Sequence, residues 1–181
     1  WYGSPLAGFR NIGIMYDGGN REQKCGELSC PWGMPSEPVL YQPARDTLAC
    51  YLRTEATMLV GTWQVGKAWR WHDTTLLLHP SSVITTPHGG LLAARQLTPV
   101  REHSSWKDGN KPARYDTSVV LYHVEGNRLR NVLTLPGSKD CGYAGLCAGQ
   151  TPREFVMSYY SSGKAPAPCA DVYIATLAVT S

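Results

Sequence analysis

The stretch DCGYAGLC, at residues 140–147, places Tyr143 between small residues and directly before an apolar run. Three roles fit this tyrosine: packing in a core, lining a binding surface, or acting as a nucleophile. A phenol with its ordinary pKa of about 10 is a weak nucleophile. It becomes a useful one when a neighbouring base takes its proton. The first question is therefore which carboxylate the fold brings to Tyr143.

The composition limits the class of protein. The chain has 181 residues, of which 43% are hydrophobic and 17% charged, as is typical of one folded domain. A net charge of +3 is too mild to indicate nucleic-acid binding. Ten Tyr and six Trp against two Phe suit either a sugar-binding surface or the core of a β-rich fold. No apolar run is long enough to cross a membrane, and a start at Trp1 indicates a processed or trimmed chain.

Six cysteines in a chain with few charges indicate an oxidising compartment, so we expect a secreted, periplasmic or cell-surface protein. Six cysteines allow 15 pairings. In one of these, Cys25–Cys30 and Cys141–Cys147 each close a short loop and leave Cys50–Cys169 as a longer pair, and the other pairings stay open. No C-x-x-C pair occurs and no histidine stands at ligand spacing, so we expect no metal and no other cofactor.

Short apolar runs separated by Gly, Pro, Asn and Asp predict β-strands along the chain. No helical apolar period extends beyond about two turns. The predicted strands fall into three groups: 39–42, 47–53, 58–65 and 74–78; then 83–86, 91–96, 117–124 and 129–135; then 144–148, 154–160 and 171–180.

The three groups look like one repeated unit, in which a strand and a short turn precede a stronger second strand. Repeats of about 40 residues built from about four strands indicate β-propeller blades, with a β-sandwich as the alternative. We expect an all-β fold with an N-terminal segment at 1–36 and blades at about 37–80, 81–136 and 137–181. The last unit stops after its third strand, so segment 9–16 is expected to close it.

Four stretches follow one another along residues 35–181: PSEPVLYQPARDTLACYLRTE, TPHGGLLAARQ, TLPGSKDCGYAGL, and FVMSYYSS followed by ADVYIATL. In this order they resemble the sialidase superfamily of BNR/Asp-box propellers, especially bacterial exo-sialidase-like members. TWQVGKAW at 62–69 keeps the Gly and Trp of the Asp-box, S-x-D-x-G-x-x-W, which links the third and fourth strands of such blades. The resemblance implies a six-bladed ring, of which this chain holds about three blades.

The resemblance also implies site residues. The family's nucleophilic tyrosine opens its last blade and corresponds to Tyr143. The glutamate of its S-E-P motif corresponds to Glu37, and two arginines of the triad that binds the substrate carboxylate correspond to Arg53 and Arg95. In a propeller the loops before each blade's first strand gather at one end of the axis, so Glu37 and Tyr143 are expected to meet. The glutamate would then take the phenolic proton.

The family's third triad arginine and its acid/base aspartate belong to an opening blade. Arg10 and Asp17, in FRNIGIMYDGG, are the only candidates for them, and DGG is equally a hairpin turn. The chain therefore either hydrolyses a sugar or keeps an anionic-sugar pocket without hydrolysis.

The sequence predicts a retaining exo-sialidase-like glycoside hydrolase acting on terminal sialic or related acidic sugars. A tyrosine nucleophile suits such a substrate, because a carboxylate nucleophile would be repelled by the sugar's own carboxylate. The alternative is a non-catalytic sialidase-like propeller that acts as a glycan-binding or structural assembly module. Because three blades cannot close a ring, we also expect a homo-oligomer or a partner chain that completes it.

Overall fold

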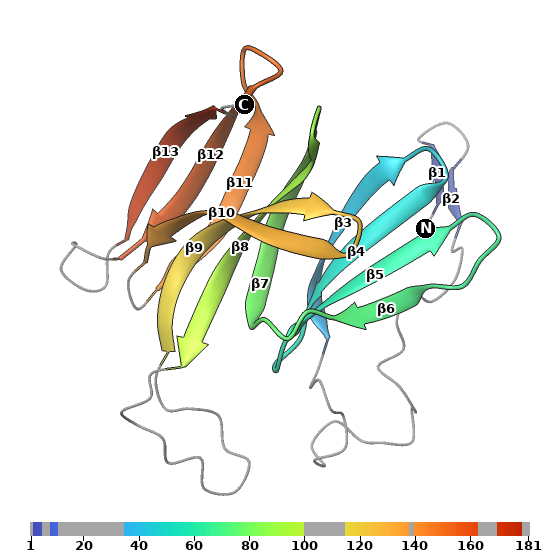
Figure 1. The fold of residues 1–181 in the computed structure, drawn as a ribbon, viewed down its shortest axis with the longest axis horizontal. Coiled ribbons are helices and arrows are strands. Elements are labelled where there is room, and N and C mark those ends of the chain that lie inside the picture. Colours follow the sequence, from blue (N-terminus) through green and yellow to red (C-terminus); the bar gives the residue numbers. More distant parts are fainter. Residues whose placement is uncertain are drawn as a thin grey trace, which may run out of the picture.

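The computed structural model describes residues 2–4, 8–10, 35–99, 115–137, 140–162 and 170–178. These residues form antiparallel strands joined by turns, and no helix occurs among them (Figure 1). The expectation of an all-β chain is therefore confirmed. Within the same residues no helix is long and apolar enough to span a membrane.

The strands form three main sheets, each an antiparallel meander in chain order. The first sheet contains β3 (Ser36–Ala44), β4 (Thr47–Arg53), β5 (Met58–Gln64) and β6 (Arg70–Asp73). The second contains β7 (Leu78–Thr86), β8 (Gly89–Pro99), β9 (Tyr115–Glu125) and β10 (Arg128–Pro136). The third contains β11 (Cys141–Ala148), β12 (Glu154–Ser161) and β13 (Asp171–Ala178). A separate hairpin pairs β1 (Tyr2–Ser4) with β2 (Gly8–Arg10).

The central strands of the second sheet, β8 and β9, are buried on both faces. Successive side chains of a strand point to opposite faces. Leu92 of β8 accordingly belongs to one core cluster with Tyr51 of the first sheet, whereas its neighbour Leu91 belongs to another with Phe155 of the third sheet. The second sheet therefore lies between the other two and holds both by apolar packing.

The first strands of the three sheets lie next to one another. β7 contacts both β3 and β11, and Figure 1 shows it between them. The Ser81 hydroxyl donates a hydrogen bond to the Ala144 carbonyl at 2.9 Å, and the Leu146 amide donates one to the Ser82 hydroxyl at 3.2 Å. These bonds join β7 to β11 in addition to the apolar contacts.

The Asp-box-like segment forms the turn between β5 and β6, as expected from its position. Gly66 adopts a left-handed φ of 77°, and the Lys67 amide donates a hydrogen bond to the Gln64 carbonyl at 2.9 Å. Trp69 and Trp71 stack with ring centroids 5.6 Å apart and pack against the buried residues of the first sheet's outer face. These tryptophans are therefore packing residues.

The predicted strand at 74–78 is wrong. β6 ends at Asp73, whose Oδ1 accepts a hydrogen bond from the Thr75 amide at 2.7 Å, and Thr75 has a left-handed φ of 59°. The Thr74 hydroxyl donates to the Met58 carbonyl at 2.7 Å. Such local side-chain bonds compete with a sheet ladder, so the chain turns here and Leu78 begins the second sheet.

The expected closing strand at 9–16 does not appear in the third sheet as described. β2 pairs with β1, with Tyr2 opposite Arg10, so one of its edges is already used by the hairpin. β13 pairs with β12. Residues 11–16 lie outside the described part of the chain.

Two of the expected disulfides are wrong, because Cys50, Cys141 and Cys147 are free thiols. Cys141 and Cys147 lie at opposite ends of β11. At about 3.3 Å per residue their Cα atoms are roughly 20 Å apart, far beyond the separation that a disulfide spans. Cys50 is buried within the first sheet. The remaining cysteines lie outside the described residues: Cys25, Cys30 and Cys169.

Gly61 tests the packing of the first sheet. It lies opposite Trp71, and a Cβ at this position would come within 2.6 Å of the indole ring. We expect Gly61→Ala to lower the free energy of unfolding by about 1–3 kcal/mol, because the indole would have to move. Urea denaturation followed by tryptophan fluorescence measures this change.

The matched control is Gly126→Asn. No atom lies within 4 Å of a Cβ built at Gly126, whose φ is 62°, and asparagine tolerates a left-handed backbone. Equal losses in the two variants would contradict the assigned contact between Gly61 and Trp71.

Candidate functional site

The candidate site lies where the first strands of the three sheets begin. Glu37 stands near the start of β3, His79 near the start of β7 and Tyr143 near the start of β11. Together with Arg53 and Arg95 they line one small cavity. Three separate sheets therefore contribute side chains to a single place.

Two β-bulges turn key side chains out of their strands. The register of β3 against β4 shifts around Glu37, and the register of β11 against β12 shifts around Tyr143. Both residues have a left-handed φ of 43°. This conformation costs a residue other than glycine about 1–3 kcal/mol and persists where the surrounding structure imposes it. Bulges of this kind re-aim side chains, often next to active sites.

The second strand of each sheet ends beside these positions. Arg53 ends β4 opposite the start of β3, Arg95 of β8 lies opposite His79, and Tyr160 of β12 lies opposite Gly142. Arg53, Arg95 and Tyr160 thus hold the same position in their sheets: each lies on the second strand, opposite a residue near the start of the first strand. Because the first strands of the three sheets are neighbours, these three residues lie in the same region.

Glu37 links a cation and a phenol. Its Oε2 accepts a hydrogen bond from Arg53 Nη1 at 2.6 Å, and its Oε1 accepts one from the Tyr143 hydroxyl at 3.3 Å. The bond from Arg53 is the main cause that lowers the pKa of Glu37 below its usual value, although burial opposes it and the bond from Tyr143 assists. Glu37 is therefore an ionised acceptor at neutral pH. Tyr143 is 69% exposed, so core packing is not its role.

Asp140 links a second arginine to a second phenol. Arg95 Nη1 lies 3.6 Å from Asp140 Oδ1, which also accepts a hydrogen bond from the Tyr160 hydroxyl at 2.9 Å. Burial, followed by the bond to Asp140, raises the pKa of Tyr160 to about 12. Tyr160 therefore stays protonated, and its ring stacks on that of Tyr143 with centroids 6.2 Å apart. The stacking supports the exposed ring of Tyr143.

Gly142 lets the β11 backbone approach Arg95. Its φ is 143°, and a Cβ there would lie 3.3 Å from Cδ of Arg95. A side chain at this position would strain the backbone and crowd the arginine. The glycine of the DCGY stretch thus keeps Arg95 beside Tyr143.

His79 lies among these charged groups as a neutral imidazole. Burial is the main cause that lowers the pKa of His79 to about 4, and Arg53 and Arg95 act in the same direction, whereas Glu37 opposes them. The site at neutral pH therefore contains charged arginines and carboxylates around an uncharged histidine.

The structure brings four of the six predicted site residues together: Glu37, Arg53, Arg95 and Tyr143. Arg10 belongs to β2, but its side chain is outside the described part of the structure. Asp17 lies outside the described residues altogether.

Three neighbouring residues were missed by the sequence analysis. His79 could have been found by aligning the repeats, because it opens β7 as Glu37 opens β3. Asp140 stands in the same DCGY stretch as Tyr143. Tyr160 lies in the predicted strand at 154–160, and nothing in the sequence indicates its bond to Asp140.

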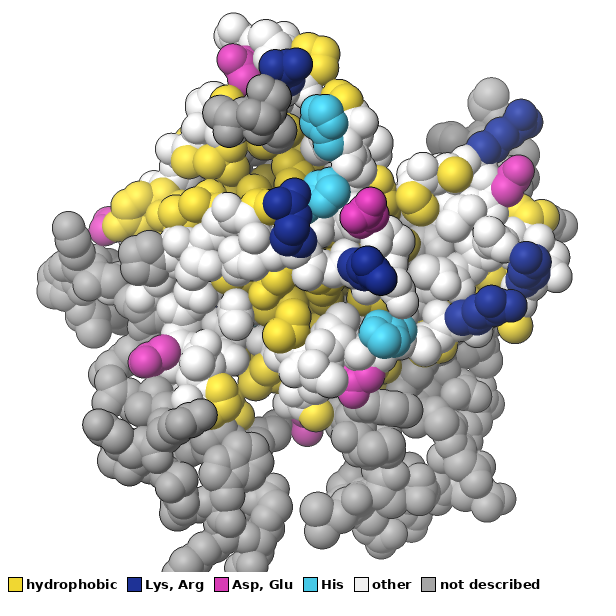
Figure 2. Space-filling model, viewed as in Figure 1, with side chains coloured by type: hydrophobic (Ala, Val, Ile, Leu, Met, Phe, Trp, Pro, Cys, Tyr) yellow, Lys and Arg dark blue, Asp and Glu magenta, His cyan; other side chains and the backbone are white. Residues whose placement is uncertain are grey.

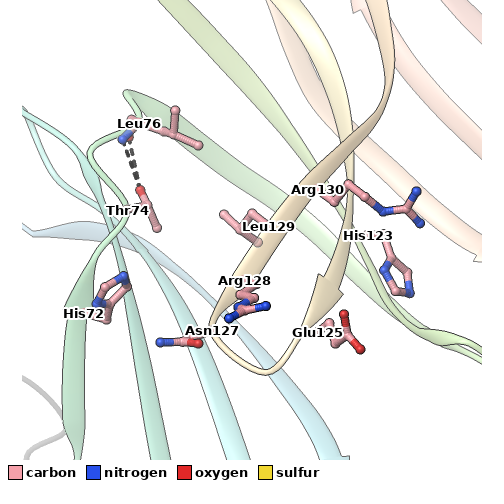
Figure 3. A pocket seen from close by; sticks show the side chains of 9 residues that line it. All are labelled: His72, Thr74, Leu76, His123, Glu125, Asn127, Arg128, Leu129 and Arg130. Carbon is pink, nitrogen blue, oxygen red and sulfur yellow. Dashed lines mark hydrogen bonds between the residues drawn. The ribbon is translucent and has the colours of Figure 1, made fainter.

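A larger cleft of about 510 Å³ lies between the turn after β6 and the β9–β10 hairpin (Figure 3). His72 and Thr74 face it from one side, and Glu125, Arg128 and Arg130 from the other. Figure 2 shows basic, acidic and histidine side chains mixed over this face. Exposed charges of both signs are typical of a solvated surface, so the small cavity remains the candidate site.

The described residues contain no group of three or more His, Cys, Asp or Glu that could hold a metal ion.

Comparison with known proteins does not place the chain in a family. No protein-family model, no curated protein and no solved structure matches it. Function is therefore inferred from the residues of the site and their geometry.

His79 makes the stability of the fold depend on pH. Its pKa is about 4 in the folded protein against an ordinary value of 6.5, so between these values the unfolded chain binds more protons. Its contribution to stability is fully present above about pH 6.5 and declines as the pH falls toward about 4. The free energy of unfolding should therefore fall less with pH in His79→Gln than in the wild type, by roughly 1–2 kcal/mol. This figure is smaller than the pKa difference alone would give, because the side chain is only partly buried and solvent screens its charge.

Urea denaturation across this pH range measures the effect. His88→Gln is the control, because His88 is an exposed turn residue. A decline of the same size in the wild type and in His79→Gln would contradict the assignment.

Proposed function

We propose that the three sheets are blades of a sialidase-like β-propeller and that the protein is a retaining exo-sialidase-like glycoside hydrolase. The proposed substrates carry terminal sialic or related acidic sugars. One observation carries the proposal: the Tyr143 hydroxyl donates a hydrogen bond to the Glu37 carboxylate across 106 positions of sequence. A phenol beside an ionised carboxylate is the arrangement of an activated nucleophile.

The sheet arrangement supports the propeller. Each of the three sheets is a meander, their first strands are neighbours, and the middle sheet is covered on both faces. Blades around a common axis have these properties. The candidate site at the starts of the first strands would then lie at one end of that axis.

The proposed reaction assigns one step to each member of the pair. Glu37 takes the phenolic proton while the Tyr143 oxygen attacks the anomeric carbon, and the bond from that carbon to the leaving oxygen breaks. The leaving oxygen takes a proton from an acid, for which Asp17 is the candidate. Water then attacks the same carbon and gives a proton to the former acid, while the bond from that carbon to the Tyr143 oxygen breaks and Glu37 returns its proton to the phenol, so two displacements retain the configuration.

Two arginines of the site are the groups that would bind an acidic sugar. Arg53 and Arg95 both line the cavity, and arginine binds carboxylates through paired, charge-assisted hydrogen bonds. The cavity itself has a volume of about 20 Å³, which suits a group about the size of one water molecule. It therefore suits a carboxylate oxygen, with the sugar ring above it.

The catalytic role of Tyr143 is tested by Tyr143→Phe, which removes only the nucleophilic oxygen. We expect the turnover of a fluorogenic α-sialoside to fall at least about 10³-fold. Tyr159→Phe is the control, because the Tyr159 ring stacks on Tyr173 within the same sheet. Absence of turnover by the wild-type protein at every pH at which it is folded would contradict the proposed reaction.

A second candidate function, an assembly module, is favoured by the exposed face of the third sheet. Val172 and Ile174 of β13 are 74% and 76% exposed, and they alternate with Tyr173, which packs on Tyr159. Exposed apolar side chains gathered on one sheet face are typical of a protein contact. We propose that this face packs against a second copy of the chain.

Light scattering tests the assembly. We expect a mass larger than that of one chain, and we expect Ile174→Asp to reduce it to one chain, because a charge buried in an apolar contact is unfavourable. Arg128→Asp on the β9–β10 hairpin is the control. A wild-type protein with the mass of one chain would contradict this candidate.

A further inference from the structure

His79 lines the cavity together with two arginines, Arg53 and Arg95. It lies directly opposite Arg95 in the β7–β8 register, so both side chains leave the sheet on the same face. His79 lies near the start of β7, in the second sheet, as Glu37 lies near the start of β3 and Tyr143 near the start of β11.

We propose that His79 takes up a proton when a carboxylate enters the cavity and so becomes the third cation that binds it. The inference rests on the proposed function, because it assigns the ligand as the carboxylate of an acidic sugar. The carboxylate would then be bound by two arginines, each already paired with a carboxylate of the protein, and by one cation that forms only on binding.

The surroundings of His79 explain why the third charge is conditional. Titratable and charged groups face it from every neighbouring strand: Glu37 from β3, Arg53 from β4, Arg95 from β8, and Cys141 and Tyr143 from β11, with Asp140 paired to Arg95. In the folded protein burial and the two arginines oppose protonation, and the pKa of His79 is low. An added negative charge within a few ångströms reverses this balance, since an opposite charge favours the protonated form.

The coupling works in both directions. If a bound carboxylate increases the proton affinity of His79 by some factor, protonation increases the affinity for the carboxylate by the same factor. Binding should therefore tighten as the pH falls. Glu37 is not the group assigned to this change, because the bond from Arg53 lowers its pKa below the usual value.

Isothermal titration calorimetry with free N-acetylneuraminic acid tests the inference. We expect the affinity of the wild-type protein to rise about fivefold or more from about pH 7.5 to about pH 5.5. Titrations in two buffers with different heats of ionisation should show uptake of up to about one proton per bound ligand. Both effects should be absent in His79→Gln.

His72→Gln is the matched control, because His72 is exposed on β6 and lines the other cleft. It should behave as the wild type. Arg53→Ala should weaken binding at every pH, which identifies the cavity as the binding place.

The outcomes separate this inference from the proposed reaction. Binding that depends on Arg53 but shows neither proton uptake nor a pH dependence that requires His79 would overturn the role of His79 and leave the hydrolase proposal standing. Binding with proton uptake but without turnover of any sialoside would overturn the hydrolase and support His79. No binding of N-acetylneuraminic acid at any pH would overturn both.

Discussion

Burial of the central strands of the second sheet on both faces is the constraint on which the rest of the structure depends. Leu91 and Leu92 are adjacent in β8, yet they pack toward different sheets and are at most 4% exposed. A buried leucine contributes about 1.5–3 kcal/mol. Because β7 belongs to this sheet, it lies between β3 and β11. The first residues of β3 and β11, which include Glu37 and Tyr143, are therefore held together as long as the core stays folded.

This frame supports a site that would not persist alone. Glu37 and Tyr143 both hold a left-handed backbone, which a flexible segment would relax. Carboxylates and arginines alternate through the pairs Glu37–Arg53 and Asp140–Arg95, so the charges of the site nearly balance. The strands that carry these residues hold the strained backbone in place.

The strand pattern could be predicted from the sequence wherever local signals agreed. The strand at 47–53 matches β4, because an apolar run there lies between turn residues on each side. The predicted strand at 74–78 is wrong, because the Asp73 side chain accepts a hydrogen bond from the Thr75 amide and the Thr74 hydroxyl donates one to the Met58 carbonyl, and the chain turns there. The predicted disulfide Cys141–Cys147 is wrong, because both cysteines lie on one extended strand. Six residues of extended chain separate their Cα atoms by more than a disulfide can span.

The sequence by itself determined the residue types of the site, because Glu37 and Tyr143 stand at the starts of repeated units and can be recognised there. Only the tertiary structure decided that these two side chains share a hydrogen bond, that His79 lines one cavity with Arg53 and Arg95, and that the Tyr160 ring stacks on the Tyr143 ring. The physical reason is that such contacts depend on how sheets pack and where a bulge shifts the register. Residues 106 positions apart meet through that packing, which no local pattern of the chain encodes.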